Sequence, residues 1–358
     1  MSNSEPDPKK AHHTPQGFRN NYGHAPRGSV WKWQWERWQK GLPKIPAEGF
    51  RFDLVRPDVA WLEDNRSEPA ITWIGHATFL LQLGGVNILT DAHFTDRASP
   101  FDFAGPRRVV PPALALRELP HIDAVVISHN HYDHLDFRTV RHLSRQAAGS
   151  PRFFVPLGLR AWFVGQGMPE VTELDWWDSA DFRGLRFHLT PVQHWSARTP
   201  FDRDRTLWGG WLVEQPGAFK FFFAGDTGYS HDFRDIGRRW PDIDLAAIPI
   251  GAYEPRWFMQ IMHVNPEEAV KIHQDLNARF SVAMHWGTFL LTDEPLDEPP
   301  HRLASARRAA GVSEEEFFLM KHGETRKLAA MMRRVEAARE PALDVPQDLV
   351  LRADDLIR

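Results

Sequence analysis

The sequence contains no cysteine, which excludes disulfide bonds and thiolate metal ligands. It has no run that approaches the roughly 20 apolar residues of a membrane-spanning helix, and residues 1–17 lack an apolar signal core. These absences predict a cytoplasmic protein, with peripheral contact at a membrane surface left open. The formal net charge is −4, from 43 basic and 47 acidic residues, so no general attraction to nucleic acid is expected.

The 358 residues are 42% hydrophobic, enough for a large core in one domain with extensions or in two domains. We expect an N-terminal extension over residues 1–65, a catalytic domain over 66–325, and a C-terminal helix and tail over 326–358. The first 28 residues are polar and rich in Pro, Gly and His, so they are expected to be flexible or draped over the surface. His12 and His13 lie there and are interpreted as solvated.

The densest group of titratable residues lies in "AVVISHNHYDHLDF", residues 124–137. Its first four residues are apolar and β-prone, which predicts a strand covered on both faces in an α/β sheet. Asp136 can cap the short helix that follows. The loop between strand and helix carries an H-x-H-x-D-H pattern, whose imidazole and carboxylate groups suit two zinc-like ions. The pattern consists of His129, His131, Asp133 and His134.

Three further strand-like runs end in a candidate ligand: His194, Asp226 and His285. Each residue alone fits a structural role equally well. A carboxylate can bridge two cations, however, and histidines from different strands can complete each coordination shell. Together with the H-x-H-x-D-H loop, these residues predict a binuclear metal centre.

The remaining pattern is that of a mixed α/β protein. Gly84 and Gly85 lie between two strand-like runs and predict a tight hairpin. Asn265 precedes Pro266 and lies three residues before Glu268, which predicts a helix with a capping box. Residues 325–340 are predicted to form an amphipathic helix. Other predicted strands cover residues 152–158, 185–192, 207–215, 220–226, 244–250 and 280–286.

Several segments between Thr72 and Glu324 resemble the metallo-β-lactamase superfamily, and more specifically its N-acylphosphatidylethanolamine-hydrolysing phospholipase D branch. They include "WIGHAT", "LTDAHF", "SHNHYDHLD", "QHWSART", "FFFAGDTGY", "IPIGAYEPRWFM" and "HWGTF". The resemblance implies a four-layer αββα sandwich, two zinc ions per chain and a homodimer. It also implies a role for Asp91, which would orient a ligand by hydrogen bonding.

The resemblance also assigns the ligands. One zinc ion would be held by His129, His131 and His194. The other would be held by Asp133, His134 and His285, and Asp226 would bridge the two.

Two such ions generate a hydroxide nucleophile and stabilise anionic oxygens, so hydrolysis is the expected reaction. Asp133 and Asp226 are the candidate catalytic carboxylates. His263 is expected to bind a phosphate oxygen or to protonate a leaving group, or else to be a helix-entry residue. Tyr132 is also a candidate catalytic residue, expected in the wall of an apolar approach to the metals, with ordinary core packing as the equal alternative. His76 is placed beside the ligands or in the core.

The predicted activity is cleavage of N-acylphosphatidylethanolamine-type phospholipids to N-acylethanolamine and phosphatidic acid. A lactonase or a phosphodiesterase acting on a small soluble metabolite is the alternative. A redox di-iron centre, a mononuclear iron dioxygenase and a non-catalytic metal-binding protein are weaker alternatives.

Four tryptophans lie in residues 30–44 beside several basic residues. Their spacing fits a helix as well as a strand. An interfacial membrane anchor would suit a phospholipid substrate. We favour packing of these rings on the catalytic domain or on a partner subunit.

Overall fold

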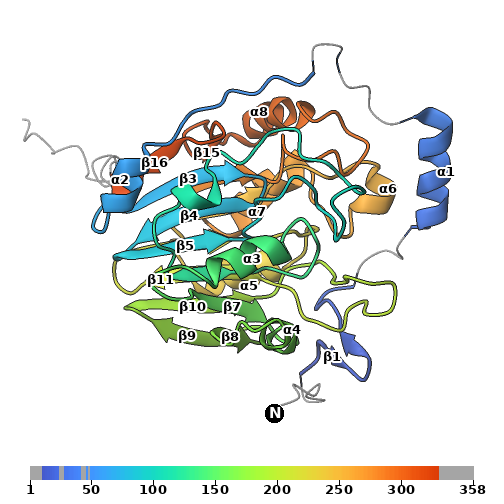
Figure 1. Cartoon of the computed structure of the whole chain (residues 1–358). Coiled ribbons are helices and arrows are strands. Elements are labelled where there is room, and N and C mark those ends of the chain that lie inside the picture. The colour runs from blue at the N-terminus through green and yellow to red at the C-terminus, as the bar shows by residue number, and fades with distance from the viewer. Residues whose placement is uncertain (1–9, 24–27, 42–45, 47–48, 330–358) are drawn as a thin grey trace, which may run out of the picture.

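The computed structural model describes residues 10–23, 28–41, 46 and 49–329 (Figure 1). Two seven-stranded sheets dominate it. In spatial order, the first sheet contains β16 (Thr325–Lys327), β3 (Ala70–Gly75), β4 (Thr78–Leu83), β5 (Val86–Thr90), β6 (Ala124–Val126), β7 (Arg152–Pro156) and β8 (Val171–Leu174). The second contains β15 (Phe317–Phe318), β14 (Phe280–Met284), β13 (Leu245–Pro249), β12 (Phe219–Phe223), β11 (Gly210–Gln215), β10 (Leu185–Thr190) and β9 (Ser179–Phe182).

Each sheet combines antiparallel and parallel strands. In the first sheet, β16, β3, β4 and β5 pair antiparallel, whereas β5 to β8 are parallel. In the second sheet, β9 to β12 pair antiparallel and β12 to β15 are parallel. Gly84 and Gly85 both have positive φ, 58° and 79°, and join β4 to β5 in the predicted two-residue hairpin.

Helices cover the outer faces of both sheets. They are α2 (Val59–Asp64), α3 (Phe137–Leu143), α4 (Arg160–Gly165), α5 (Asp232–Arg239), α7 (Pro266–Asp275) and α8 (Glu298–Ala310). Residues of α2, α3 and α4 share one apolar cluster with alternate residues of the first sheet, such as Leu80 and Val125. The other face of that sheet packs on the second sheet, and α5, α7 and α8 complete this larger cluster. The layers therefore form the expected αββα sandwich, with α3 and α4 in front of the first sheet in Figure 1.

The local capping signals of the sequence are confirmed. The Asp136 side chain accepts a hydrogen bond from the Arg138 amide at the start of α3. Asn265 and Glu268 form the predicted capping box of α7. None of the described helices is long and apolar enough to cross a membrane.

Two expectations about the chain ends are wrong. Residues 325–327, predicted as the start of the C-terminal helix, form strand β16 because they pair with β3. Residues 330–358, which contain most of that predicted helix and the tail, lie outside the described residues. His12 and His13 are not solvated, because the nitrogen Nε2 of each contacts the carboxylate of Asp175 at 2.7 and 2.9 Å. A short hairpin of β1 (His13–Thr14) and β2 (Gly17–Phe18) holds them there.

The Trp-rich segment is a helix, α1 (Val30–Lys40), which stands apart from the sandwich on the side of α6 (Arg256–Met259) (Figure 1). Of the four tryptophans, Trp33 packs on the catalytic domain: its ring stacks on Phe258, and its indole donates to Asp293 at 2.9 Å. Trp31, Trp35 and Trp38 are 85%, 58% and 76% exposed. Packing on the catalytic domain is therefore correct for Trp33 and wrong for the other three, whose packing on a partner subunit stays a prediction.

Candidate metal centre

The predicted metal ligands come from loops that follow strands of both sheets. His129, His131, Asp133 and His134 follow β6, whereas His194, Asp226 and His285 follow β10, β12 and β14. The strands β10, β12, β13 and β14 all run in one direction, so their carboxyl ends lie at the same edge of the second sheet. The structure brings all seven side chains together at this edge.

Three histidines form the first group. The distance from His129 Nε2 to His131 Nδ1 is 2.8 Å, and the distance from His131 Nδ1 to His194 Nε2 is 3.3 Å. Burial lowers the pKa of His131 and of His194 to about 3, and burial with neighbouring imidazoles lowers that of His129 well below its usual value. These rings are therefore neutral near pH 7, as metal binding requires.

The second group contains Asp133, His134 and His285. The Nε2 atoms of the two histidines are 3.2 Å apart, and Asp133 Oδ2 lies 3.3 and 3.4 Å from them. Asp226 lies between the groups: Oδ2 is 3.0 Å from His134 Nε2 and 3.9 Å from both His129 Nε2 and His194 Nε2. Its other oxygen, Oδ1, is 3.0 Å from His285 Nε2.

These spacings fit metal coordination. Ligand atoms about 2.05 Å from a tetrahedral zinc ion lie about 3.3 Å from one another. The donor set contains only nitrogen and oxygen atoms, which suits zinc and related borderline cations. In addition, two pairs of imidazole nitrogens face each other: Nε2 of His134 and of His285 at 3.2 Å, and Nε2 of His194 and Nδ1 of His131 at 3.3 Å. Each pair needs a shared proton or a cation between its lone pairs.

Several groups fix the orientation of the ligands. Asp91 accepts hydrogen bonds from Ser128 N, from Ser128 Oγ and from His134 Nδ1 at 2.7, 2.5 and 2.6 Å. The orienting contact expected of Asp91 is therefore present. His194 Nδ1 contacts the carbonyl oxygen of Met262 at 2.9 Å, so that ring presents Nε2 to the centre. His76 contacts Asp133 Oδ2 at 3.1 Å, which places it beside the ligands as expected.

The two remaining catalytic candidates differ in position. His263 Nδ1 lies 3.9 Å from Asp226 Oδ2, and this nitrogen is buried without a hydrogen-bond partner among the described residues. His263 is therefore close enough to act on a molecule bound at this centre. The Tyr132 hydroxyl instead donates to the carbonyl oxygen of Arg198 at 3.0 Å. The polar and ring contacts observed for Tyr132 among the described residues are to Arg198, so its catalytic role stays a prediction.

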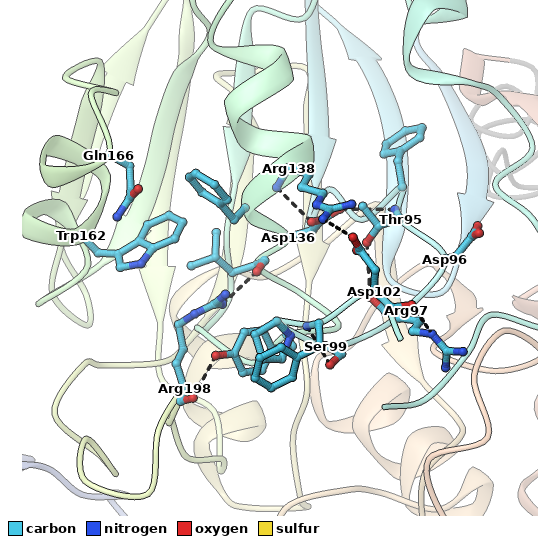
Figure 2. A pocket seen from close by; sticks show the side chains of 16 residues that line it. Thr95, Asp96, Arg97, Ser99, Asp102, Asp136, Arg138, Trp162, Gln166 and Arg198 are labelled. Atoms are coloured by element: carbon cyan, nitrogen blue, oxygen red, sulfur yellow. Dashed lines mark hydrogen bonds and ion pairs between the residues drawn. The ribbon is translucent and has the colours of Figure 1, made fainter. Parts of the chain in front are cut away.

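Tyr132 lines a cavity of about 630 Å³ on the outer side of the metal-binding loop (Figure 2). Trp162 and Gln166 lie at one side of it, and Arg138 is paired with Asp102 at the other. The guanidinium of Arg198 lies 4.0 Å from the centroid of the Tyr132 ring. None of the seven predicted metal ligands lines this cavity, so it adjoins the centre without containing it.

Comparison with known proteins identifies the family. Residues 86–286 match the beta-lactamase superfamily domain. The chain belongs to the metallo-β-lactamase superfamily. An N-acyl-phosphatidylethanolamine-hydrolyzing phospholipase D from Caenorhabditis elegans is 43% identical over 254 residues, which cover 67% of this chain and 71% of that protein. A mitochondrial protein of the same name from Saccharomyces cerevisiae is 36% identical over 267 residues, which cover 72% of this chain and 56% of that protein.

Solved structures support the same fold. A metallo hydrolase, Igni18 from Ignicoccus hospitalis, superimposes with a TM-score of 0.54 at 22% identity, covering 73% of this chain and 98% of that one. An isothiocyanate hydrolase from Delia radicum gut bacteria gives a TM-score of 0.57 at 20% identity, covering 72% and 98%. As a member of the metallo-β-lactamase superfamily with His/Asp clusters capable of binding metal, the chain is a metal-dependent hydrolase.

Proposed function

We propose that this metallo-β-lactamase superfamily member is a binuclear zinc phosphodiesterase that cleaves N-acylphosphatidylethanolamine-type phospholipids to N-acylethanolamine and phosphatidic acid. The observation that carries the proposal is the position of the Asp226 carboxylate between two groups of three potential ligands. The names of the worm and yeast relatives supply the substrate class.

In this proposal, one ion is held by His129, His131 and His194, and the other by Asp133, His134 and His285. Asp226 contributes to both. Seven ligands exceed what one tetrahedral ion can use, which favours two ions. When bound, the two ions supply an activated water and positive charge that stabilises the phosphodiester oxygens.

Side chains and backbone groups of the chain would orient the metal ligands and contact a bound phosphodiester. Asp91 and the Met262 carbonyl hold the imidazoles of His134 and His194 in one tautomer each. Burial lowers the pKa of His263 to about 3, so its ring is neutral and can donate one N–H to a phosphate oxygen. We assign His263 to that contact, because its Nδ1 faces Asp226 from outside the two ligand groups.

A phospholipid substrate also requires access to a bilayer. Helix α1 presents Trp31, Trp35 and Trp38 to solvent, with Lys32 and Lys40 on the same helix. The exposed Phe101 lines the cavity beside the metal-binding loop, and Phe103 and Phe201 are also exposed. Exposed tryptophans beside lysines are typical of surfaces that rest in the headgroup region of a membrane. We therefore propose peripheral membrane contact through α1.

The test combines metal analysis with a substrate panel. Zinc-loaded protein should contain close to two ions per chain by elemental analysis. Vesicles that contain N-acylphosphatidylethanolamine should yield N-acylethanolamine and phosphatidic acid by mass spectrometry, and a chelator should abolish this turnover. One iron ion per chain, without zinc-dependent activity, would contradict the binuclear zinc centre.

The same panel decides the substrate class. It should include a soluble phosphodiester and a small lactone as well as the phospholipid. Good turnover of either soluble compound without any phospholipid cleavage would favour a lactonase or a small-metabolite phosphodiesterase. The cavity beside Tyr132, with three arginines in its wall, is the feature that such a substrate would use.

A further inference from the structure

The N-terminal arm, residues 10–22, is fixed on the catalytic domain at both ends. At its start, Lys10, His12 and His13 all contact the carboxylate of Asp175, and the His12 ring stacks on Trp176. At its end, two side chains contact the carboxylates at the start of α5. These contacts join Asn21 to Asp232 at 2.8 Å and Tyr22 to Asp235. The arm precedes the residues that match the superfamily domain, which begin at 86.

Between these anchors, the Asn20 side chain holds the backbone of His194. Its Nδ2 donates to the carbonyl oxygen of His194 at 3.0 Å, and its Oδ1 accepts from the amide of His194 at 3.1 Å. The same oxygen accepts from the indole of Trp208 at 3.1 Å. One carboxamide thus satisfies both backbone polar groups of a single residue, which restricts both rotation and translation of that peptide segment.

The ring of His194 has a separate restraint at the Met262 carbonyl. That contact sets the tautomer, but it fixes the direction of Nε2 only if the backbone of His194 is also held. Asn20 supplies this second restraint from a segment that is 174 residues away in sequence. His194 Nε2 lies 3.3 Å from His131 Nδ1, so a small shift of the His194 backbone would change the first ligand group directly.

We propose that Asn20 is a positioning residue for the metal centre, acting through the backbone of His194. The inference rests on the proposed metal centre but not on the proposed substrate. The N-terminal arm is then part of the active site's support, and the first metal site depends on residues outside the superfamily domain.

The experiment measures metal binding in the full-length protein. The variant Asn20→Ala is compared with Asn21→Ala, a matched control that removes an arm contact to Asp232 but none to His194. Metal affinity is measured by competition with a chromophoric chelator, and cobalt is used as a spectroscopic probe. We expect Asn20→Ala to weaken one of the two metal sites at least tenfold and to change the visible cobalt spectrum, as substitutions behind metal ligands do. Asn21→Ala should change neither.

Asn20→Gln covers the case in which Asn20→Ala does not fold. It keeps the amide but displaces it by one methylene, so it should still weaken that site and alter the cobalt spectrum. Wild-type spectra and affinities within twofold in a folded Asn20 variant would overturn the proposal and leave a purely structural arm. Failure of the wild-type protein to bind two ions would instead refute the proposed centre itself.

Discussion

Replacement of Asp91 by Asn tests how much the metal centre depends on a residue that is not itself a predicted ligand. The Asp91 side chain is completely buried and accepts three hydrogen bonds, from Ser128 N, Ser128 Oγ and His134 Nδ1. In Asp91→Asn, the amide oxygen can still accept from the Ser128 amide. The new NH₂ group, however, faces the Nδ1 of His134 where the carboxylate Oδ2 was. Two donors then meet in a buried site, so the His134 ring must turn, move or transfer its proton to Nε2, and each of these changes disturbs Nε2 as a metal ligand.

The magnitude follows from that lost contact. A hydrogen bond to a charged group contributes about 1.5–3 kcal/mol, and loss of a ligand's hydrogen-bonding partner reduces metal affinity by about 10–100-fold. This 10–100-fold loss of metal affinity corresponds to about 1.4–2.7 kcal/mol of binding free energy. We expect the loss in the site that contains His134, with the other site affected less. Metal titration against a competing chelator would resolve the two dissociation constants.

The matched control is Asp136→Asn, at the end of the loop that carries the H-x-H-x-D-H pattern. This carboxylate is also buried and accepts hydrogen bonds from Arg138 N, Thr139 Oγ and Thr95 N, but none of these groups is a predicted ligand. The Asp136→Asn variant should lower the free energy of unfolding by about as much as Asp91→Asn does, and it should leave metal affinity within about threefold of wild type. Equal metal affinities in Asp91→Asn and in the wild type would refute the reasoning.

Three further predictions address the bridge, the membrane and the arm. Asp226→Asn should lose most activity and weaken both metal sites, because an amide is a poor bridge between two metal ions. Near-normal turnover of a soluble phosphodiester would exclude Asp226 as a ligand. Replacing Trp31, Trp35 and Trp38 together by Ala should spare hydrolysis of the soluble phosphodiester and reduce hydrolysis of vesicle phospholipid. All three rings are exposed, and surface changes affect stability little. A parallel fall in both activities would contradict the proposed membrane contact. Burial opposes ionisation of Asp175, but its nitrogen donors hold its pKa well below the usual value. The stabilisation from this carboxylate, about 2 kcal/mol, is therefore present above the unfolded-state pKa of about 4 and is lost as pH falls through the lower folded-state pKa. The free energy of unfolding of Asp175→Asn should accordingly be lower than that of wild type near pH 7, and the two values should converge in acid. A difference between them that stays constant with pH would contradict this prediction.

Local signals in the sequence predicted much of the sandwich and the cluster of potential ligands. Buried strands such as β6, β12 and β14 are short, mainly apolar runs followed within three residues by His or Asp, so both strand and strand end are visible in the sequence. Strands β8 and β9 gave no such signal, because they lie at the ends of the sheets, where the two central residues of β8 are partly exposed and no residue of β9 is buried. The resemblance to the superfamily supplied the pairing of ligands, which spacing alone could not.

Long-range contacts account for most of what was missed. Asn20 lies in a polar segment, and nothing in its neighbourhood indicates a contact with His194. The conformation of the Trp-rich segment was ambiguous because its tryptophans fit two periods. Its ends decide for a helix: the Ser29 side chain accepts from the Lys32 amide, and Gly41 has a positive φ of 77° at the other end.

The division of the predicted ligands between two sheets affects folding as well as catalysis. The first sheet carries His129, His131, Asp133 and His134, and the second carries His194, Asp226 and His285. A bound ion would therefore act as a cross-link between the two halves of the sandwich, which, apart from β16, follow one another along the chain at the short β8–β9 connection. Metal at 100 times its dissociation constant would add about 2.7 kcal/mol to the free energy of unfolding, and this stabilisation would act across the plane between the sheets. Amide hydrogen exchange after chelation should accordingly accelerate first at that plane, with the outer helices less affected.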